Sequence, residues 1–290
     1  MKIGIFGFNI GPIAEPGVMM KVLRCADRTG YESVWTGEHV VLIDPQEPPS
    51  PAAPETPMLD TVAALAFAAA HTEHVKLGSG IILLPQRNPV VLAKELAGID
   101  VLSKGRLIFG VGVGYVRREF EAIGVPYEER GPRTTEHIEA IRALWTQDHP
   151  TFDGEFTSFH GIQSHPQPVQ KPHPPIVIGG GSPAAFRRAV AQGDGWYGFA
   201  LDPEATATAL QSLKEAAEQV ERPASLGPLE ISITPPRPVD TATVEQYEAL
   251  GVARLPLLLP TRRGGADGPD DVVAFLERTA EELNLRAIRT

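Results

Sequence analysis

Short apolar runs alternate with helix-length segments along most of the chain. The runs over 2–8, 76–81 and 107–112 are continuously apolar, as expected for parallel strands buried on both faces. Further strands are predicted over 33–35, 176–178, 195–197, 230–233 and 254–258. Helices are predicted between them, over 18–28, 61–71, 89–102, 134–145, 183–191, 203–220, 243–250 and 270–283. Eight strands alternating with helices predict an α/β fold in a single domain over 1–290, a (β/α)8 TIM barrel.

Two proline-rich stretches interrupt this alternation. Residues 44–57 have no periodicity and follow the second predicted strand, so they would form a long loop at the C-terminal mouth of the barrel. Residues 152–175 begin with an apparent hairpin around Asp153-Gly154 and continue as proline-rich coil. They indicate an insertion, at about 150–175, before the fifth strand. For both stretches, an ordered lid and a surface decoration remain open interpretations.

The composition narrows the choice of partners and compartment. A formal net charge of −10 disfavours nucleic acid and anionic membranes as partners. No apolar run reaches transmembrane length and no secretory signal is visible, so we expect a cytoplasmic protein. The spacing of the histidines does not resemble a zinc signature, so we expect no metal site. Because Cys25 is the single cysteine, we expect no intrachain disulfide.

Glycines gather where the third and fourth predicted strands end. The third strand ends in Gly78-Ser79-Gly80, which indicates a bulge, a close approach by another group, or a plain transition to a loop. The fourth strand ends in Gly110-Val111-Gly112-Val113-Gly114, whose glycines share one face. A glycine face at the mouth of a barrel leaves room for a flat ring against the backbone, or else reflects tight packing inside the barrel.

A third glycine cluster, Gly179-Gly180-Gly181, follows the fifth strand and leads through Ser182 into a helix that starts at Pro183. Free backbone N–H groups at a helix N-terminus favour an anion such as phosphate. We therefore predict a phosphate site here, with Ser182 either capping the helix or contacting the phosphate.

An acidic residue and a histidine, Glu38 and His39, come directly after the second strand. At a barrel mouth this pair is suited to general acid–base chemistry. A structural histidine is the competing interpretation, and Glu38 has the further alternative of accepting hydrogen bonds from the backbone or a cofactor.

Together these motifs resemble the luciferase-like monooxygenase superfamily, and within it the F420-dependent oxidoreductases. The motifs that carry the resemblance are WTGEH at 35–39, LGSGI at 77–81, RNP at 87–89, LSKGR at 102–106, GVGVG at 110–114, ERG at 129–131, FDGEF at 152–156, PHPPI at 172–176, GGG at 179–181 and GDGW at 193–196. The similarity is dense from Lys2 to Tyr197, and over the last third only the barrel rhythm supports it.

The resemblance implies an interrupted β/α barrel with a flavin-type ring at its mouth. It implies a non-prolyl cis peptide in the third strand, which by position is Gly80-Ile81. It also implies coenzyme F420 as cofactor, a small-molecule substrate, and a homodimer. Glu38 and His39 match the acidic-His pair of the F420-dependent sugar-phosphate dehydrogenases, and we expect His39, Tyr115 and Glu38 to be the catalytic residues. The implied cofactor-binding residues are Phe8, Glu38, Gly80, Ile81, Gly112, Gly114, Gly179, Gly180, Gly181 and Ser182.

One position departs from the F420-dependent sugar-phosphate dehydrogenases of this group. Those enzymes place a carboxylate directly after the fourth-strand glycines, and this chain has Tyr115. A phenol is a poor substitute for a carboxylate, although it can donate a proton or a hydrogen bond. Hydride transfer between F420 and a small organic molecule is thus the expected activity. The alternatives are an FMN-dependent monooxygenase served by a separate cofactor reductase, and a barrel that binds a flavin-like ligand without turnover.

Overall fold

The computed structural model describes residues 1–260 and 269–286. Within these residues, eight parallel strands form a closed barrel: β1 (Lys2–Phe6), β2 (Ser33–Thr36), β3 (Lys76–Ser79), β5 (Leu107–Gly112), β8 (Ile176–Gly179), β9 (Gly195–Phe199), β10 (Glu230–Thr234) and β11 (Arg254–Leu258). The ring closes because β1 pairs with both β2 and β11, and β3 pairs with β5. The (β/α)8 barrel predicted from the sequence is confirmed.

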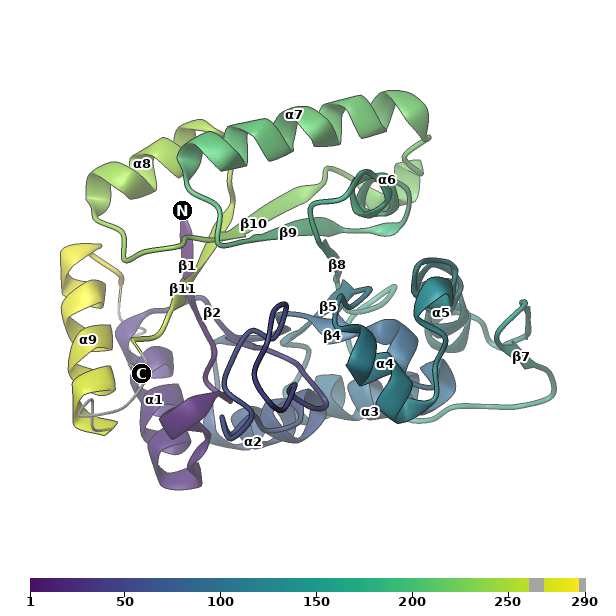
Figure 1. Cartoon of the computed structure of the whole chain (residues 1–290), viewed down its shortest axis with the longest axis horizontal. Coiled ribbons are helices and arrows are strands. Elements are labelled where there is room, and N and C mark those ends of the chain that lie inside the picture. Colours follow the sequence, from purple (N-terminus) through teal and green to yellow (C-terminus); the bar gives the residue numbers. More distant parts are fainter. Residues whose placement is uncertain (261–268, 287–290) are drawn as a thin grey trace.

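Helices surround the strands, with α7 and α8 on one side and α2 and α3 on the opposite side (Figure 1). Their bounds are α1 (Pro16–Thr29), α2 (Thr61–His71), α3 (Pro89–Leu102), α4 (Arg117–Ile123), α5 (Arg130–Thr146), α6 (Pro183–Gln192), α7 (Pro203–Gln219), α8 (Thr241–Ala249) and α9 (Pro269–Glu282). Side-chain caps start several of them, for example Asp60 before α2 and Asn88 before α3. Helix α4 was not predicted from the sequence, and α5 begins earlier than expected. None of the described helices is long and apolar enough to cross a membrane.

The third barrel strand is broken at the predicted position. After β3 ends at Ser79, the Gly80–Ile81 peptide bond is cis, and the strand resumes as β4 (Ile82–Leu83). Gly78 pairs with Ile108, whereas Ile82 pairs with Val111, so the broken strand holds one residue more than β5 over this interval. That count defines a β-bulge at the mouth.

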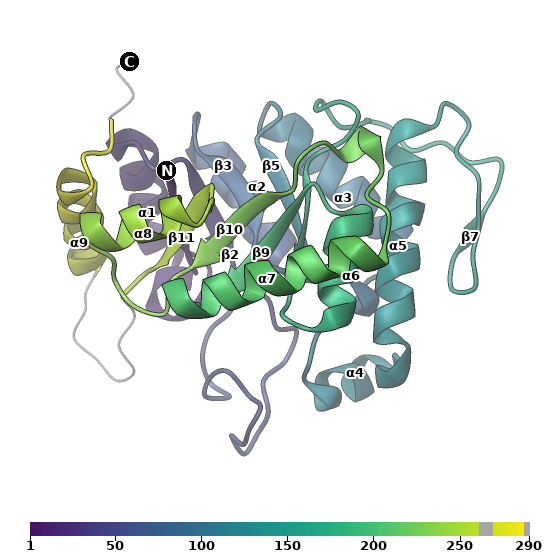
Figure 2. The ribbon, with the colours of Figure 1, turned by 90° about the horizontal axis from the view of Figure 1, so that it is seen from above.

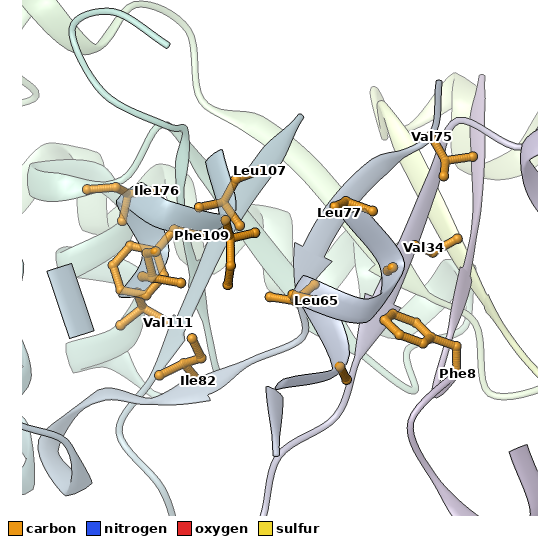
Figure 3. Packing of buried hydrophobic residues seen from close by; sticks show 14 of the residues in the cluster. Phe8, Val34, Leu65, Val75, Leu77, Ile82, Leu107, Phe109, Val111 and Ile176 are labelled. Atoms are coloured by element: carbon orange, nitrogen blue, oxygen red, sulfur yellow. The ribbon is translucent and has the colours of Figure 1, made fainter. Parts of the chain in front are cut away.

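The hydrophobic core has two parts. Most buried side chains lie between the strands and the surrounding helices (Figure 3). A smaller cluster fills the barrel interior and consists of Phe6, Trp35, Ile108, Val177 and Tyr197. The Trp35 and Tyr197 rings stack with centroids 5.5 Å apart. The interior is therefore packed, and chemistry is left to the mouth.

The two proline-rich stretches have different positions. The insertion carries the predicted hairpin, β6 (Phe152–Asp153) and β7 (Ser158–Phe159), which lies on the outer side of α5 (Figure 2). There the Glu136 carboxylate accepts hydrogen bonds from the backbone N–H groups of Glu155 and Phe156. The insertion is thus a surface decoration. The loop over 44–57 projects from the same end of the barrel as α4 (Figure 2), and Glu47 pairs with Arg118 of that helix at 2.6 Å.

A cluster of charges around the buried Arg254 side chain lies at the opposite end of the barrel, where the strands begin. The Arg254 side chain is 4% exposed and binds Glu32 at 2.7 Å and Glu230 at 2.5 Å. Burial acts to raise the pKa of both carboxyl groups, but the Arg254 charge and hydrogen bonds outweigh it, so both pKa values lie below the ordinary value.

This cluster predicts acid-sensitive folding. A carboxyl group whose pKa is lowered by folding stabilises the protein above its unfolded pKa, about 4.5, and this contribution is lost as the pH falls through the folded pKa. Arg254→Met should lower the free energy of unfolding by about 2 kcal/mol at pH 7, a value between those for exposed and buried ion pairs. It should also make the free energy of unfolding depend less on pH below about 4.5. Urea unfolding at pH 7 and at acid pH measures both effects. Lys21→Met, which removes an exposed pair with Asp270, is the control and should change little. Parallel pH curves for wild type and Arg254→Met would contradict the prediction.

Candidate active site

The end of β2 is held in place by Asn9, which is fully buried. Its side-chain amide donates to the Gly37 carbonyl at 2.9 Å and to the Leu59 carbonyl at 2.7 Å, and its oxygen accepts from the Gly37 N–H at 2.9 Å. These bonds join the loop after β1, the end of β2 and the end of the long loop. They fix the backbone from which Glu38 and His39 project.

His39 lies between two side chains that come from one short segment. Its Nδ1 atom is 3.3 Å from Oε2 of Glu119, in α4. Its Nε2 atom is 3.4 Å from the hydroxyl oxygen of Tyr115, and the two rings meet edge to face with centroids 5.5 Å apart. The predicted catalytic residues His39 and Tyr115 are therefore neighbours at the mouth.

Tyr115 is the accessible member of this group, with 48% of its surface exposed. Burial of the remainder raises the pKa of its hydroxyl, and the nearby Glu119 charge acts in the same direction. The hydroxyl therefore keeps its proton at neutral pH and is able to donate it in a hydrogen bond.

Glu38 does not partner His39, because consecutive residues at a strand end point to opposite sides. Its Oε1 atom instead accepts from Arg87, 3.0 Å from Nε, and Arg87 also binds Asp60 at 2.7 Å. The other oxygen, Oε2, is buried and has no hydrogen-bond partner among the described residues. Burial raises the pKa of Glu38, although the Arg87 charge opposes the shift. Glu38 and His39 therefore do not form the pair expected from the sequence, and the carboxylate that faces His39 is that of Glu119.

The glycines of the fourth and fifth strands make room for a side chain of this protein. A Cβ on Gly112 would lie 2.1 Å from Cδ1 of Ile81, and a Cβ on Gly179 would lie 2.6 Å from the same atom. The glycine face therefore packs tightly against Ile81 and is not left open for a flat ring. Ile81, at the bulge, is the residue through which Gly112 and Gly179 shape the mouth.

Gly114 lies beyond this face and has a positive φ of 75°. The amide of Gln86 is nearby, with Nε2 3.6 Å from the position of a Cβ on Gly114. Both polar atoms of that amide are buried without a hydrogen-bond partner in the part of the chain described.

Phe8, which was assigned to cofactor binding from the sequence, does not lie on the exposed surface of the mouth. Phe8 is fully buried in the cluster between strands and helices, where Figure 3 shows its ring. The inward position on β1 belongs to Phe6, whose ring packs against Phe199 with centroids 5.1 Å apart. The chain turns at Gly7, with φ of 92°, so strand alternation does not extend to residue 8.

The turn after β8 retains the features of an anion site. Gly180 has a φ of 111°, and its carbonyl accepts from the Trp196 indole at 2.9 Å. Ser182 caps α6 by accepting from the Ala185 N–H at 3.2 Å. Around Gly181, no described atom outside its two chain neighbours lies within 4 Å of the position of a Cβ. Ser182 is thus a cap, and the exposed turn beside it stays a predicted phosphate site.

Four site residues were not predicted from the sequence: Asn9, Gln86, Arg87 and Glu119. Glu119 stands four residues after Tyr115, and this spacing is the local signal that joins the two. The described residues contain no cluster of potential metal ligands.

Comparison with known sequences places the chain in a family. The profile of the luciferase-like monooxygenase family matches residues 7–256. The uncharacterized protein Rv0953c of Mycobacterium tuberculosis is 30% identical over 271 residues, which cover 90% of this chain and 92% of that protein. The oxygenase component of the flavin-dependent trigonelline monooxygenase of Acinetobacter baylyi is 36% identical over 177 residues, or 60% of this chain and 46% of the relative.

Solved structures share the fold. Monooxygenase RslO1 of Streptomyces bottropensis superposes with a TM-score of 0.78 at 24% identity, covering 98% of this chain and 99% of that one. An F420-dependent secondary alcohol dehydrogenase, solved with an F420-acetone adduct, gives 0.77 at 16% identity, covering 97% and 98%. These neighbours include both monooxygenase and F420-dependent enzymes. The family resemblance drawn from the sequence motifs is confirmed: the chain belongs to the luciferase-like monooxygenase family.

Proposed function

We propose that this protein is an F420-dependent oxidoreductase that transfers a hydride between the deazaflavin ring and a small organic substrate. The observation that carries the proposal is the hydrogen-bonded pair of His39 and Tyr115 at the mouth. When a hydride moves to or from the carbon of a C–O group, the oxygen must gain or lose a proton. A tyrosine hydroxyl backed by an imidazole supplies an exchange partner for that proton.

The residues present fit a flavin-type ring with a phosphate-bearing tail. Ile81 and Phe199 offer apolar surface, and the exposed turn at Gly181 offers backbone N–H groups beside a helix N-terminus. Oε2 of Glu38 and the amide of Gln86 are buried polar atoms that still lack partners among the described residues. A polar ring edge would satisfy such groups. The bound deazaflavin would supply the hydride chemistry, and the protein would position the substrate and exchange the proton.

Apolar side chains around the mouth support an uncharged substrate. Val41, Tyr115 and Phe199 are 43%, 48% and 49% exposed, and each follows or ends a different barrel strand. The arginines nearest to them in sequence, Arg117 and Arg118, are paired with Glu128 and Glu47. An uncharged alcohol, aldehyde or ketone suits these surroundings better than a sugar phosphate.

An FMN-dependent monooxygenase is the second candidate. It is favoured by the similarity to the trigonelline monooxygenase oxygenase component. That protein is 36% identical to this chain over 177 residues, whereas Rv0953c is 30% identical over 271 residues. In that case reduced flavin would come from a separate reductase.

Titration of the purified protein with F420 and, separately, with FMN tests the proposal. Fluorescence quenching should give a dissociation constant for F420 at least about tenfold below that for FMN, a difference of about 1.4 kcal/mol. Consumption of F420 with a panel of uncharged alcohols, followed by its absorbance, should then identify a substrate. Tight FMN binding without F420 binding would overturn the proposal in favour of the monooxygenase. Tight F420 binding without turnover of any alcohol, aldehyde or ketone would favour a non-catalytic binding protein.

A further inference from the structure

Glu119 is a fully buried carboxylate beside the mouth. The residue and its side chain are 0% exposed. Burying an unpaired carboxylate costs several kcal/mol, so such a group persists only with partners that offset the cost. Here Oε1 accepts from the backbone N–H of Val40 at 2.5 Å, and Oε2 faces Nδ1 of His39 at 3.3 Å. Both partners belong to the segment that follows β2.

The geometry restricts where the imidazole proton lies. An ionised carboxylate only accepts hydrogen bonds, so a bond to Glu119 requires the proton on Nδ1 of His39. In the neutral ring, Nε2 then carries a lone pair. The Tyr115 hydroxyl, 3.4 Å from Nε2, is left as the donor to it.

We propose that Glu119 is a positioning residue that holds His39 in the tautomer with the proton on Nδ1, so that Nε2 accepts a hydrogen bond from the Tyr115 hydroxyl. Its catalytic consequence rests on the proposed function, whereas the tautomer itself does not. Tyr115 and Glu119 lie four residues apart and contact opposite nitrogens of one ring. The segment that starts α4 therefore supplies both the donor and the group that orients the acceptor. A carboxylate near the fourth strand is thus present in this chain, four residues beyond the position of Tyr115.

The competing explanation is that Glu119 only anchors the start of the long loop through Val40. Glu119→Gln separates the two roles, because its amide oxygen can still accept from the Val40 N–H. Its amide NH2 would face Nδ1 as a donor and favour the tautomer with the proton on Nε2. Glu121→Gln, an exposed position of the same helix, is the matched control.

Nitrogen-15 NMR of histidine-labelled protein, at about pH 8.5 where an ordinary imidazole is neutral, reads the tautomer without any cofactor. The His39 signals are assigned by their loss in His39→Ala. We expect wild type and Glu121→Gln to carry the proton on Nδ1 and Glu119→Gln to carry it on Nε2. A proton on Nε2 in the wild type would overturn the proposal, and so would an unchanged tautomer in folded Glu119→Gln.

Kinetics supply a second readout once a substrate is known. Glu119→Gln should lower kcat about 10–100-fold with little change in KM, which is the range for residues that orient a catalytic group. In the His39→Ala background the same change should have almost no further effect, because both act through one ring. Additive losses would contradict a role through His39. A correct tautomer result combined with failed F420 binding would leave the positioning role intact and reject only the proposed cofactor.

Discussion

Replacing His39 by alanine should lower kcat about 10²–10⁴-fold while the dissociation constant for F420 changes less than about threefold. The loss follows from the position of the ring, which contacts Tyr115 on one side and Glu119 on the other. Without the imidazole, the Tyr115 hydroxyl loses its acceptor and Oε2 of the buried Glu119 loses a partner. Cofactor affinity should hold because the predicted phosphate turn and the bulge are built by other elements.

Steady-state kinetics and fluorescence titration on the same preparations measure the two quantities. His74→Ala is the matched control, since His74 also faces a carboxylate, Asp27 at 3.4 Å. It precedes β3 and so lies at the opposite end of the barrel from the mouth. The control should retain wild-type turnover and affinity. Unchanged turnover in His39→Ala would remove His39 from the mechanism, and a large loss of F420 affinity would make it a binding residue.

The barrel could be predicted from the sequence because strands that are buried on both faces consist of consecutive apolar residues. Runs such as 107–112 are apolar at consecutive positions since helices cover one side and the barrel interior the other. Caps at Asp60 and Asn88 marked where helices begin. The short helix α4 leaves no such mark, because its seven residues include four charged ones and give no apolar stripe.

Contacts within the site were harder to predict, since they join distant residues. His39 and Glu119 are 80 positions apart, and nothing local to either indicates the other. Phe8 shows a different limit: Gly7, with a φ of 92°, turns the chain after β1, and the Phe8 side chain is buried in the main core cluster. The three glycine clusters were located correctly, but the sequence could not tell whether a ligand or a side chain fills the space beside them.

The Ile81 side chain fills the space beside the glycines of the fourth and fifth strands. It lies beside Gly112 and Gly179, and also approaches Gly110. Three glycines from two neighbouring strands thus seat the one side chain that follows the broken strand. Their effect on a bound ring would be exerted through the position of Ile81. Substitution at these glycines should therefore change folding and cofactor binding together.

Gly110→Ala should be the most destabilising single substitution in this region, lowering the free energy of unfolding by about 3 kcal/mol. A Cβ at this position would lie 1.9 Å from the backbone oxygen of Ser79, so the strand itself would have to move. The same movement would break two bonds of the Ser79 hydroxyl, which accepts from the Gly110 N–H at 2.7 Å and donates to its carbonyl at 2.9 Å.

Because Ser79 directly precedes the bulge, Gly110→Ala should also weaken F420 binding at temperatures where the variant remains folded. Gly98→Ala in α3 is the matched control, since no described atom other than those of its chain neighbours and the local helix backbone lies within 4 Å of the position of its Cβ. Glycine in a helix costs about 0.5–1 kcal/mol relative to alanine, so the control should be slightly more stable than wild type. Chemical unfolding followed by circular dichroism, with F420 titration at low temperature, gives both comparisons. Equal stability of the two variants would mean that β3 and β5 are not packed as tightly as this contact requires. Normal F420 binding by a destabilised Gly110→Ala variant would mean that the bulge does not contribute to the cofactor site.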